Sequence, residues 1–534
     1  MAQTGAQTSR MITYFNSDDF KDTATSILNR FRVPGLAVAV VHNKDTASRA
    51  FGASAFASQP PQTAAKSMTT QTLFEIGSAS MSLTAAAVAL LVADERYPDV
   101  RYDAEMAELL PGQFVMPGKK HMGVTVEDIL SHRTGMAPNE DAHIGSCSPQ
   151  RDDAQTVTLN IRNLSTAAPI RSRHMPCRLM YTAASWLVER KTRKVFADFL
   201  DHRVFAPLGM TMSSLWLSRA RVKGHGDYIC PGFSWDPVTG YCCFHKTDSA
   251  AAQGAGLIVT NVDDYIKYIQ AVMNQEPPFT EAVCEGLLRP RSIVSHADEK
   301  LLPLRSPALC AAGWEVFYYR GCKVVAHGGR TAGSSATSFF LPTLKFGAVI
   351  FGNMEIAEVA GELLMQEFLD EVLNAPQEHR FTQDQRIQLL GRSRLHGDAF
   401  PTRAALAGVG ASQPNLDQEI DGQKMLLKTY VGEYWNPGWR GIKVKVNVRT
   451  NRLLIDCSDR LRGFTLTLER FAGQTMYLAK KQYVTGETGS TMRVEFRFEH
   501  GCVRRVGVWL EPELDDYIWF ERTAAQGEVD EADS

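Results

Sequence analysis

The sequence predicts an α+β protein: a larger domain in which helices flank an antiparallel sheet, followed by a small antiparallel β-barrel. Residues 33–44, VPGLAVAVVHNK, form a nearly continuous apolar run ended by a polar turn, as expected of a buried strand entering a hairpin. Residues 324–353 contain three apolar runs separated by a glycine turn and a proline turn, which predicts consecutive antiparallel strands of a central sheet. Residues 430–521 contain eight short segments of alternating polarity and no convincing helix, which predicts the barrel.

Helices are predicted at several places around this sheet. Asp18–Phe31 has helical spacing, and residues 74–92, FEIGSASMSLTAAAVALLV, read as a turn followed by a long apolar helix. Residues 124–136, VTVEDILSHRTGM, begin with a threonine cap and an acidic first turn and then break at Gly135, which predicts a short helix running into a loop. An amphipathic helix is expected from about Val262, after a Thr or Asn cap.

The length of 534 residues predicts more than one domain, because a single compact core rarely grows so large. Between about Asn374 and Gln423 the sequence is polar and lacks a sustained apolar period, which is typical of a linker. The predicted boundaries are a first domain at 1–375, a linker at 376–423, the barrel at 424–524 and a disordered acidic tail at 525–534.

The composition excludes several classes of partner and cofactor. Lys and Arg total 57 against 59 acidic residues, so no basic field is available to hold nucleic acid or an anionic membrane. The ten cysteines lack CxxC pairs or histidines at zinc spacing, which indicates reduced thiols and neither a metal site nor a cofactor. The N-terminus lacks a signal-peptide pattern, and no apolar run reaches about 18 residues, so a soluble cytoplasmic protein is expected.

Three separate stretches carry candidate catalytic groups. Ser78 lies near the first turn of a buried helix, where free backbone N–H groups and the helix dipole favour an oxyanion; the competing interpretation is that Ser78 or Ser80 merely caps the helix. Tyr181 comes at a loop-to-helix junction and would otherwise be a packing tyrosine. His327 precedes two glycines on a strand, where a lone histidine is more often structural.

Residues 221–252 are rich in glycine, aromatic residues and cysteine, without a clear period. A long irregular loop of this kind suits a pocket wall or lid. We therefore expect an apolar substrate pocket near Phe233, Trp235, Tyr241 and Phe244, with plain packing as an equally good alternative.

Taken together, these stretches resemble the serine β-lactamase and penicillin-binding-protein superfamily, most closely its class C-like esterases, D-aminopeptidases and fungal acyltransferases. The resemblance covers about residues 15–373 and implies a β-lactamase/transpeptidase-like domain with a helical subdomain. A barrel described as lipocalin-like accompanies several such relatives, and the barrel expected here resembles it. The matched segments, in chain order, are VPGLAVAVV, FEIGSAS, ILSHRTGM, LMYTAASWL, GAGLIVTNVDDYIKY and HGG followed by FLPTLKFGAVIFGN.

The first motif of that superfamily is SxxK, in which Ser accepts the acyl group and Lys assists its deprotonation. Here it reads Ser78-Ala79-Ser80-Met81, so the lysine is replaced by a residue of similar length without charge or comparable basicity. Three explanations stay open, in order of preference: an engineered inactivating replacement, a natural pseudoenzyme, and a natural enzyme that uses another base. General-base assistance is typically worth about 100- to 10,000-fold, so we expect slow acylation or none.

The other motifs fit the esterase branch better than the lactamases. Tyr-x-Asn is matched by Tyr181 with an alanine at the Asn position, and the Lys-Thr-Gly motif takes its His-x-Gly form at His327, Gly328 and Gly329. The resemblance implies that Tyr181 handles protons, His327 orients or polarises, and the glycines line the substrate. It also implies an oxyanion hole formed by the N–H groups of Ser78 and Arg330, worth about 2.7 to 4 kcal/mol per donor. Without the lysine charge, holding Tyr181 ionised at pH 7 would cost roughly 4 kcal/mol.

The resemblance implies a serine hydrolase or acyltransferase that cleaves or transfers an ester, lactone or thioester of a bulky, fairly apolar small molecule. An acyl-enzyme on Ser78 would pass its acyl group to water, to an alcohol or to a carrier protein, as in fungal specialised metabolism. The alternatives are a non-catalytic binding protein on the same scaffold and a non-hydrolytic cyclase or isomerase.

Overall fold

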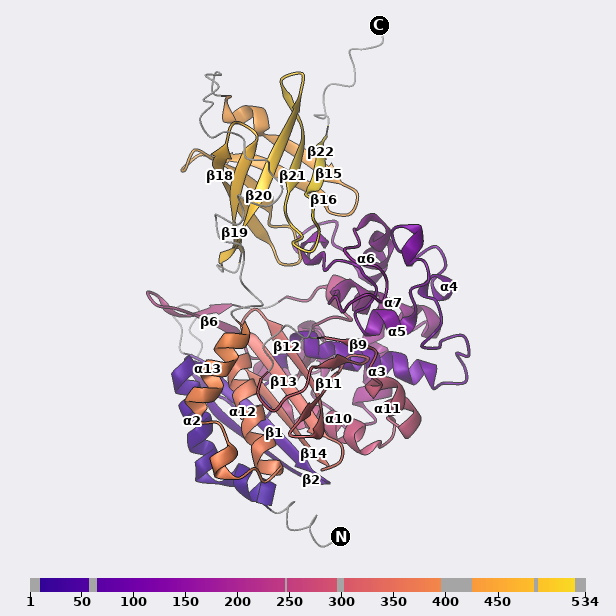
Figure 1. Cartoon of the computed structure of the whole chain (residues 1–534), viewed down its shortest axis with the longest axis vertical. Coiled ribbons are helices and arrows are strands. Elements are labelled where there is room, and N and C mark those ends of the chain that lie inside the picture. Colours follow the sequence, from indigo (N-terminus) through magenta and orange to yellow (C-terminus); the bar gives the residue numbers. More distant parts are fainter. Residues whose placement is uncertain are drawn as a thin grey trace. The chain divides into compact units, whose positions relative to one another are not determined.

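The computed structural model describes residues 10–56, 65–244, 247–294, 302–394, 425–484 and 488–523 (Figure 1). The chain divides into two compact units. The first, called the sheet unit below, comprises Met1–Gly135, Asp153–Leu159 and Pro169–Leu395. The second, called the barrel unit, comprises Met136–Asp152, Asn160–Ala168 and His396–Ser534.

An antiparallel sheet forms the centre of the sheet unit, with nine strands among the described residues in the order β3-β2-β1-β14-β13-β12-β11-β10-β9. The expected hairpin near the N-terminus is β1 and β2, and the three strands expected at 324–353 are β12, β13 and β14, so both predictions are confirmed. Strands far apart in the sequence meet where β1 pairs with β14, with Leu36 opposite Gly352. The strands are β1 (Gly35–His42), β2 (Asp45–Ala55), β3 (Lys66–Ser67), β9 (Ser292–Ile293), β10 (Leu309–Cys310), β11 (Glu315–Tyr319), β12 (Cys322–Thr331), β13 (Ser334–Leu341) and β14 (Phe346–Gly352).

Helices cover both faces of this sheet (Figure 1). On one face α2 (Asp18–Phe31) and α12 (Ala357–Val372) enclose a hydrophobic core in which the Phe20 and Phe368 rings stack 5.2 Å apart. On the other face α10 (Val262–Asn274) contacts β1, β13 and β14. Every residue of β1 is buried, because alternate side chains face these two layers. Both α2 and α10 occupy the ranges expected from the sequence.

A group of buried helices beside the sheet carries the remaining predicted segments. The apolar helix is α3 (Ser80–Val92), which contacts α7 (Arg178–Thr192) and α11 (Glu281–Leu288). The short helix is α5 (Val126–Leu130), where Thr125 and Asp128 form the reciprocal capping box that the threonine and the acidic first turn suggested. Among the described residues, every helix is too short or too polar to cross a bilayer.

The barrel unit contains the predicted barrel, a closed antiparallel one with eight described strands in sequence order. It also holds two segments from the middle of the chain. Ile144 forms a β-bridge with Arg460, the Asn139 N–H donates to Glu511 at 2.7 Å, and the Asn160 side chain donates to the Gly438 carbonyl at 2.8 Å. The strands are β15 (Gly432–Asn436), β16 (Arg440–Asn447), β17 (Arg452–Cys457), β18 (Phe464–Ala472), β19 (Met476–Tyr483), β20 (Thr488–Glu499), β21 (Cys502–Val508) and β22 (Ile518–Arg522).

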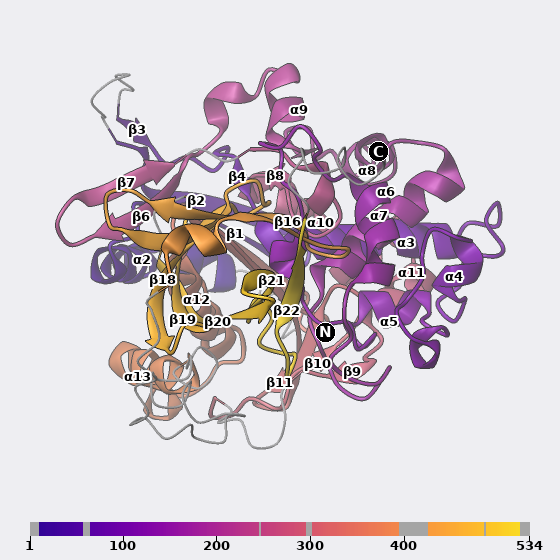
Figure 2. The same ribbon diagram turned by 90° about the horizontal axis from the view of Figure 1, so that it is seen from above.

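Two segments differ from expectation. The predicted linker at 376–423 contains α13 (Gln383–Arg394), which contacts α12 through an ion pair of Arg386 with Asp370 at 2.8 Å. Residues 395–424 of that linker, and the predicted tail, lie outside the described residues. The expected irregular loop at 221–252 contains a hairpin of β6 (Gly232–Asp236) and β7 (Gly240–Phe244), seen near β2 in Figure 2.

Candidate active site

The Ser78 turn connects the sheet unit's small second sheet to helix α3. Strand β4 (Phe74–Glu75) pairs with β8 (Ile258–Thr260), and a single 3-10 turn, Gly77–Ala79, then leads into α3. Gly77 has φ +54°, and a Cβ there would lie 2.5 Å from the Arg330 carbonyl oxygen, so this turn requires glycine.

The hydroxyl of Ser78 is free of the competing capping role. Of residues 72–91, Ser78 is the one that is not buried. Helix α3 begins without a side-chain cap, and the Ser80 hydroxyl instead accepts the Ile258 N–H at 3.2 Å. Ser78 is therefore a half-buried residue with an uncommitted side chain at the N-terminal end of a buried helix, where the helix dipole favours negative charge.

Strand β12 runs directly against this turn. A Cβ on Gly329 would lie 2.0 Å from the Ile76 oxygen and 3.0 Å from the Ser78 nitrogen. Gly328 faces the other way and is exposed, and a Cβ there would meet nothing closer than 3.6 Å. Of the two glycines expected to line the substrate, Gly329 thus contacts the Ser78 turn and Gly328 does not.

His327 lies two residues before Gly329, on the same side of the strand. Its Nδ1 makes a 2.5 Å hydrogen bond with the Gly313 carbonyl, and its ring meets Trp314 edge-on. Burial lowers the pKa of His327 below its usual range, while the backbone of Gly313 and of Ser78 acts in the opposite direction. Burial therefore favours the neutral imidazole, and the Ser78 backbone is part of the surroundings of the ring.

Met81 and Tyr181 are both enclosed. Met81 is 4% exposed on α3, so the position of the family's lysine is filled by an apolar side chain. Tyr181 lies within the first turn of α7, not at a junction before the helix, and it is fully buried. Its hydroxyl donates to the Leu130 carbonyl at 2.6 Å, and burial raises its pKa well above 10. Ionising Tyr181 at pH 7 therefore costs more free energy than the sequence suggested.

Sequence reasoning did not single out His132, which lies in the ILSHRTGM segment immediately after α5. Its ring stands 5.2 Å from the Tyr181 ring, and its Nδ1 accepts the Cys177 N–H at 3.2 Å. Burial, with smaller contributions from His174 and His327, lowers the pKa of His132 to about 3. A histidine near the three motifs could have been noticed, but its contacts depend on segments distant in sequence.

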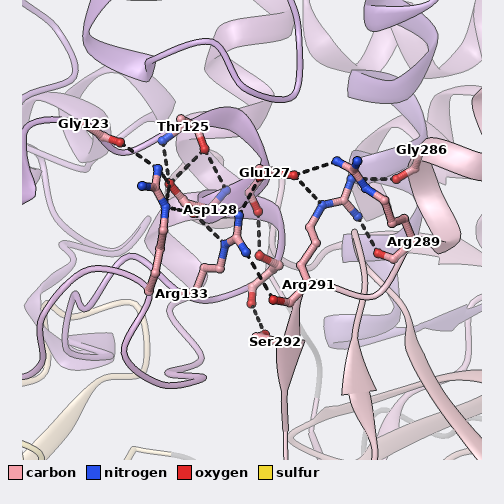
Figure 3. A network of polar contacts seen from close by, with 11 residues as sticks. Gly123, Thr125, Glu127, Asp128, Arg133, Gly286, Arg289, Arg291 and Ser292 are labelled. Carbon is pink, nitrogen blue, oxygen red and sulfur yellow. Dashed lines mark hydrogen bonds and ion pairs between the residues drawn. The ribbon is translucent and has the colours of Figure 1, made fainter.

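A network of arginines and carboxylates holds the segment that supplies Leu130 and His132 (Figure 3). Asp128 is fully buried and accepts hydrogen bonds from Arg133 at 2.6 Å and Arg171 at 2.7 Å. Burial raises the pKa of the Asp128 carboxyl, but the hydrogen bonds from Arg171 and Thr125 outweigh it, so the pKa lies below its usual range. Neighbouring Glu127 pairs with Arg133, Arg289 and Arg291.

The aromatic hairpin lies against other parts of the sheet unit. Trp235 packs under the Arg32 guanidinium, 4.6 Å from the ring centroid, and the Tyr241 hydroxyl donates to the Arg32 carbonyl at 2.8 Å. Phe233 is buried, and its N–H donates to the Asn353 carbonyl at 3.1 Å. Trp235 and Tyr241 thus pack against the residue that ends α2. That Phe233, Trp235 and Tyr241 bind substrate stays a prediction.

The guanidinium of Arg330 faces Glu358, at 3.4 Å, and Glu355, at 3.9 Å. The oxyanion role expected of its N–H, together with that of Ser78, stays a prediction. Among the described residues, no three His, Cys, Asp or Glu side chains gather in a way that would hold a metal ion.

Comparison with known proteins identifies the family of this chain. The Beta-lactamase family model matches residues 20–363. Two curated proteins named unguisins hydrolase, from Aspergillus campestris and Aspergillus violaceofuscus, are each 28% identical to this chain. The first match covers 94% of this chain and 91% of that protein, and the second 95% and 90%.

Solved structures share the fold at lower identity. The octameric penicillin-binding protein homologue from Pyrococcus abyssi has a TM-score of 0.57 at 15% identity, covering 95% of this chain and all of that one. A D-amino acid amidase from Ochrobactrum anthropi has a TM-score of 0.52 at 19% identity, covering 67% of this chain and 99% of the amidase. With its β-lactamase-like domain and closed C-terminal barrel, the chain belongs to the beta-lactamase family of serine hydrolases.

Proposed function

We propose that this chain is a serine acyl hydrolase that cleaves an ester, lactone or thioester of a bulky small molecule through an acyl-enzyme on Ser78. One observation carries the proposal: within residues 72–91 Ser78 is the residue left unburied, at a helix N-terminus and against a glycine strand. The curated relatives are named as hydrolases, which favours water over an alcohol or a carrier protein as the acyl acceptor. Because those names specify unguisins, unguisins are tested beside the esters below.

The proposed chemistry uses the backbone more than the side chains. The Ser78 oxygen attacks the acyl carbon, and the N–H groups of Ser78 and Arg330 receive the oxyanion, each donor contributing about 2.7 to 4 kcal/mol. Met81 supplies no positive charge, and the Tyr181 hydroxyl is committed to Leu130. Acylation is consequently slower than in a family member that has the lysine.

A non-catalytic binding protein is the second candidate, and one observation favours it. Both proton carriers of the family motifs are compromised here, one by replacement with Met81 and the other by burial of the Tyr181 hydroxyl. In that case the protein would bind its ligand without forming a bond to Ser78.

Intact-protein mass spectrometry separates these candidates. Wild type, Ser78→Ala and Met81→Lys are each incubated with a fluorophosphonate, with p-nitrophenyl esters and with unguisins. The proposal predicts a covalent adduct on wild type, none on Ser78→Ala, and faster labelling of Met81→Lys. Saturable binding of an ester by wild type, with no adduct on wild type or Met81→Lys, would establish the binding protein instead.

A further inference from the structure

Transfer of the Ser78 proton needs an acceptor, and this chain lacks the family's usual one. Met81 has no basic group, and the Tyr181 hydroxyl is buried as a donor to Leu130. We propose that His327 is the acceptor, because Gly313 fixes the proton on its Nδ1 and the register of β12 places the ring on the face of the strand that meets the Ser78 turn. This inference rests on the proposed function.

The register of β12 directs His327 toward Ser78. Residues two apart on a strand share a face, and the missing side chain of Gly329 would point into the backbone of Ile76, Ser78 and Ala79. The loop at Gly313 contacts the same helix, since a Cβ on Gly313 would lie 2.8 Å from the Met81 carbonyl oxygen. The His327 ring is thus held between the Gly313 loop and the start of the Ser78 helix.

The hydrogen bond to Gly313 determines which nitrogen is basic. A carbonyl oxygen only accepts, so Nδ1 of His327 must carry hydrogen, and in the neutral ring Nε2 keeps its lone pair. Because Nδ1 is engaged by Gly313, Nε2 is the nitrogen left to accept a proton. The backbone of Gly313 and of Ser78 also acts to raise the pKa of His327. The same backbone groups favour the imidazolium that forms when the proton arrives.

His132 has the opposite arrangement, although it lies in the same region. Its Nδ1 accepts the Cys177 N–H, so its neutral ring carries hydrogen on Nε2 and has no second lone pair to offer. With its pKa lowered to about 3 by burial, His132 is also a weaker base than His327 at neutral pH. The structure therefore selects His327 over its neighbour on grounds of tautomer as well as position.

The proton balance closes with His327 alone. As Ser78 Oγ bonds to the acyl carbon, its proton moves to Nε2, and the carbonyl electron pair becomes the oxyanion. When the oxyanion collapses, the bond to the leaving oxygen or sulfur breaks and that atom takes the proton from Nε2. Water then attacks the acyl-enzyme, gives its proton to Nε2, and the proton returns to Ser78 Oγ as the acid leaves.

The test measures the burst of p-nitrophenol from a p-nitrophenyl ester between about pH 5 and pH 9, with the adduct on Ser78 confirmed by mass. The variants are His327→Gln, Tyr181→Phe, Met81→Lys/His327→Gln and, as a matched control, His174→Gln. Wild type should lose activity as pH falls through a pKa below about 6.5, because the base must be unprotonated. His327→Gln should acylate about 100- to 10,000-fold more slowly and lose this acid limb.

The remaining variants identify the base. His174→Gln and Tyr181→Phe should keep the acid limb of wild type. Rescue of His327→Gln by Met81→Lys, with the limb moved to another pH, would show that the site is still folded. Equal acylation by wild type and His327→Gln with the same acid limb overturns the inference and leaves the proposed function standing. Absence of an adduct on both wild type and Met81→Lys overturns both.

Discussion

Replacing Gly329 by alanine tests the contact between β12 and the Ser78 turn. The added Cβ would lie 2.0 Å from the Ile76 oxygen, which is 1.4 Å short of the 3.4 Å at which ordinary contact begins. Because that oxygen and the Ala79 nitrogen, at 2.5 Å, both belong to the backbone, no side-chain rotation can relieve the overlap. Overpacking of this kind costs about 1–3 kcal/mol, and a displacement near 1 Å at a nucleophile costs about 100-fold in rate.

Gly328→Ala is the matched control for folding, because its Cβ would have no neighbour closer than 3.6 Å. Urea unfolding should show Gly329→Ala destabilised by about 1–3 kcal/mol and Gly328→Ala within about 0.5 kcal/mol of wild type. Burst acylation of Gly329→Ala should fall about 100-fold. Wild-type stability and rate in Gly329→Ala, or equal destabilisation by the two substitutions, would refute the packing described for this strand.

Two further predictions concern buried charges. Asp128→Asn leaves Arg133 and Arg171 facing a neutral group and should cost about 3 kcal/mol in urea unfolding at pH 7. Because the pKa of Asp128 is lower in the folded state, the stabilisation that its carboxylate provides is complete above the unfolded pKa of about 3.9 and is lost as pH falls through the folded pKa. The unfolding free energy of Asp128→Asn should lack this dependence on acid pH. The same acid dependence in Asp128→Asn as in wild type would count against the network. In the barrel unit, Lys481 pairs with Asp141, and their side chains are 6% and 12% exposed. Lys481→Met should cost about 3 kcal/mol, and Lys481→Met/Asp141→Asn should recover part of it; additive effects in the double-mutant cycle would show that the two charges are uncoupled.

The sequence predicted the parts of the fold whose signals are local. Continuous burial of β1 and the alternation of barrel strands such as β16 and β17 follow directly from residue periods, and both appear in the structure. The capping box at Thr125 and Asp128 is likewise a short-range pattern. For the site, Ser78 was identified because a turn precedes a long apolar helix, and Gly329 because two glycines follow His327 on a predicted strand.

Features that depend on distant partners were not predictable in the same way. Helix α13 has a weak apolar pattern, and its buried Arg386 is compensated by Asp370 of a different helix. The hairpin of β6 and β7 did carry a local signal, because Asp236 accepts the N–H groups of Val238 and Thr239 in the turn. The surroundings of the Tyr181 hydroxyl come from Leu130, far away in the sequence, and no residue pattern near Tyr181 indicates them.

The barrel unit incorporates Met136–Asp152 and Asn160–Ala168 as well as the C-terminal chain. Chimaeras with other family members therefore cannot be joined at one point before the barrel. A barrel transplanted from another family member would lack its own counterparts of Asp141, Asn139 and Asn160. The corresponding segments of the recipient would then contact barrel strands whose side chains do not match them. Exchange should succeed only when all three stretches are transplanted together, so in this protein the unit of recombination is discontinuous in sequence.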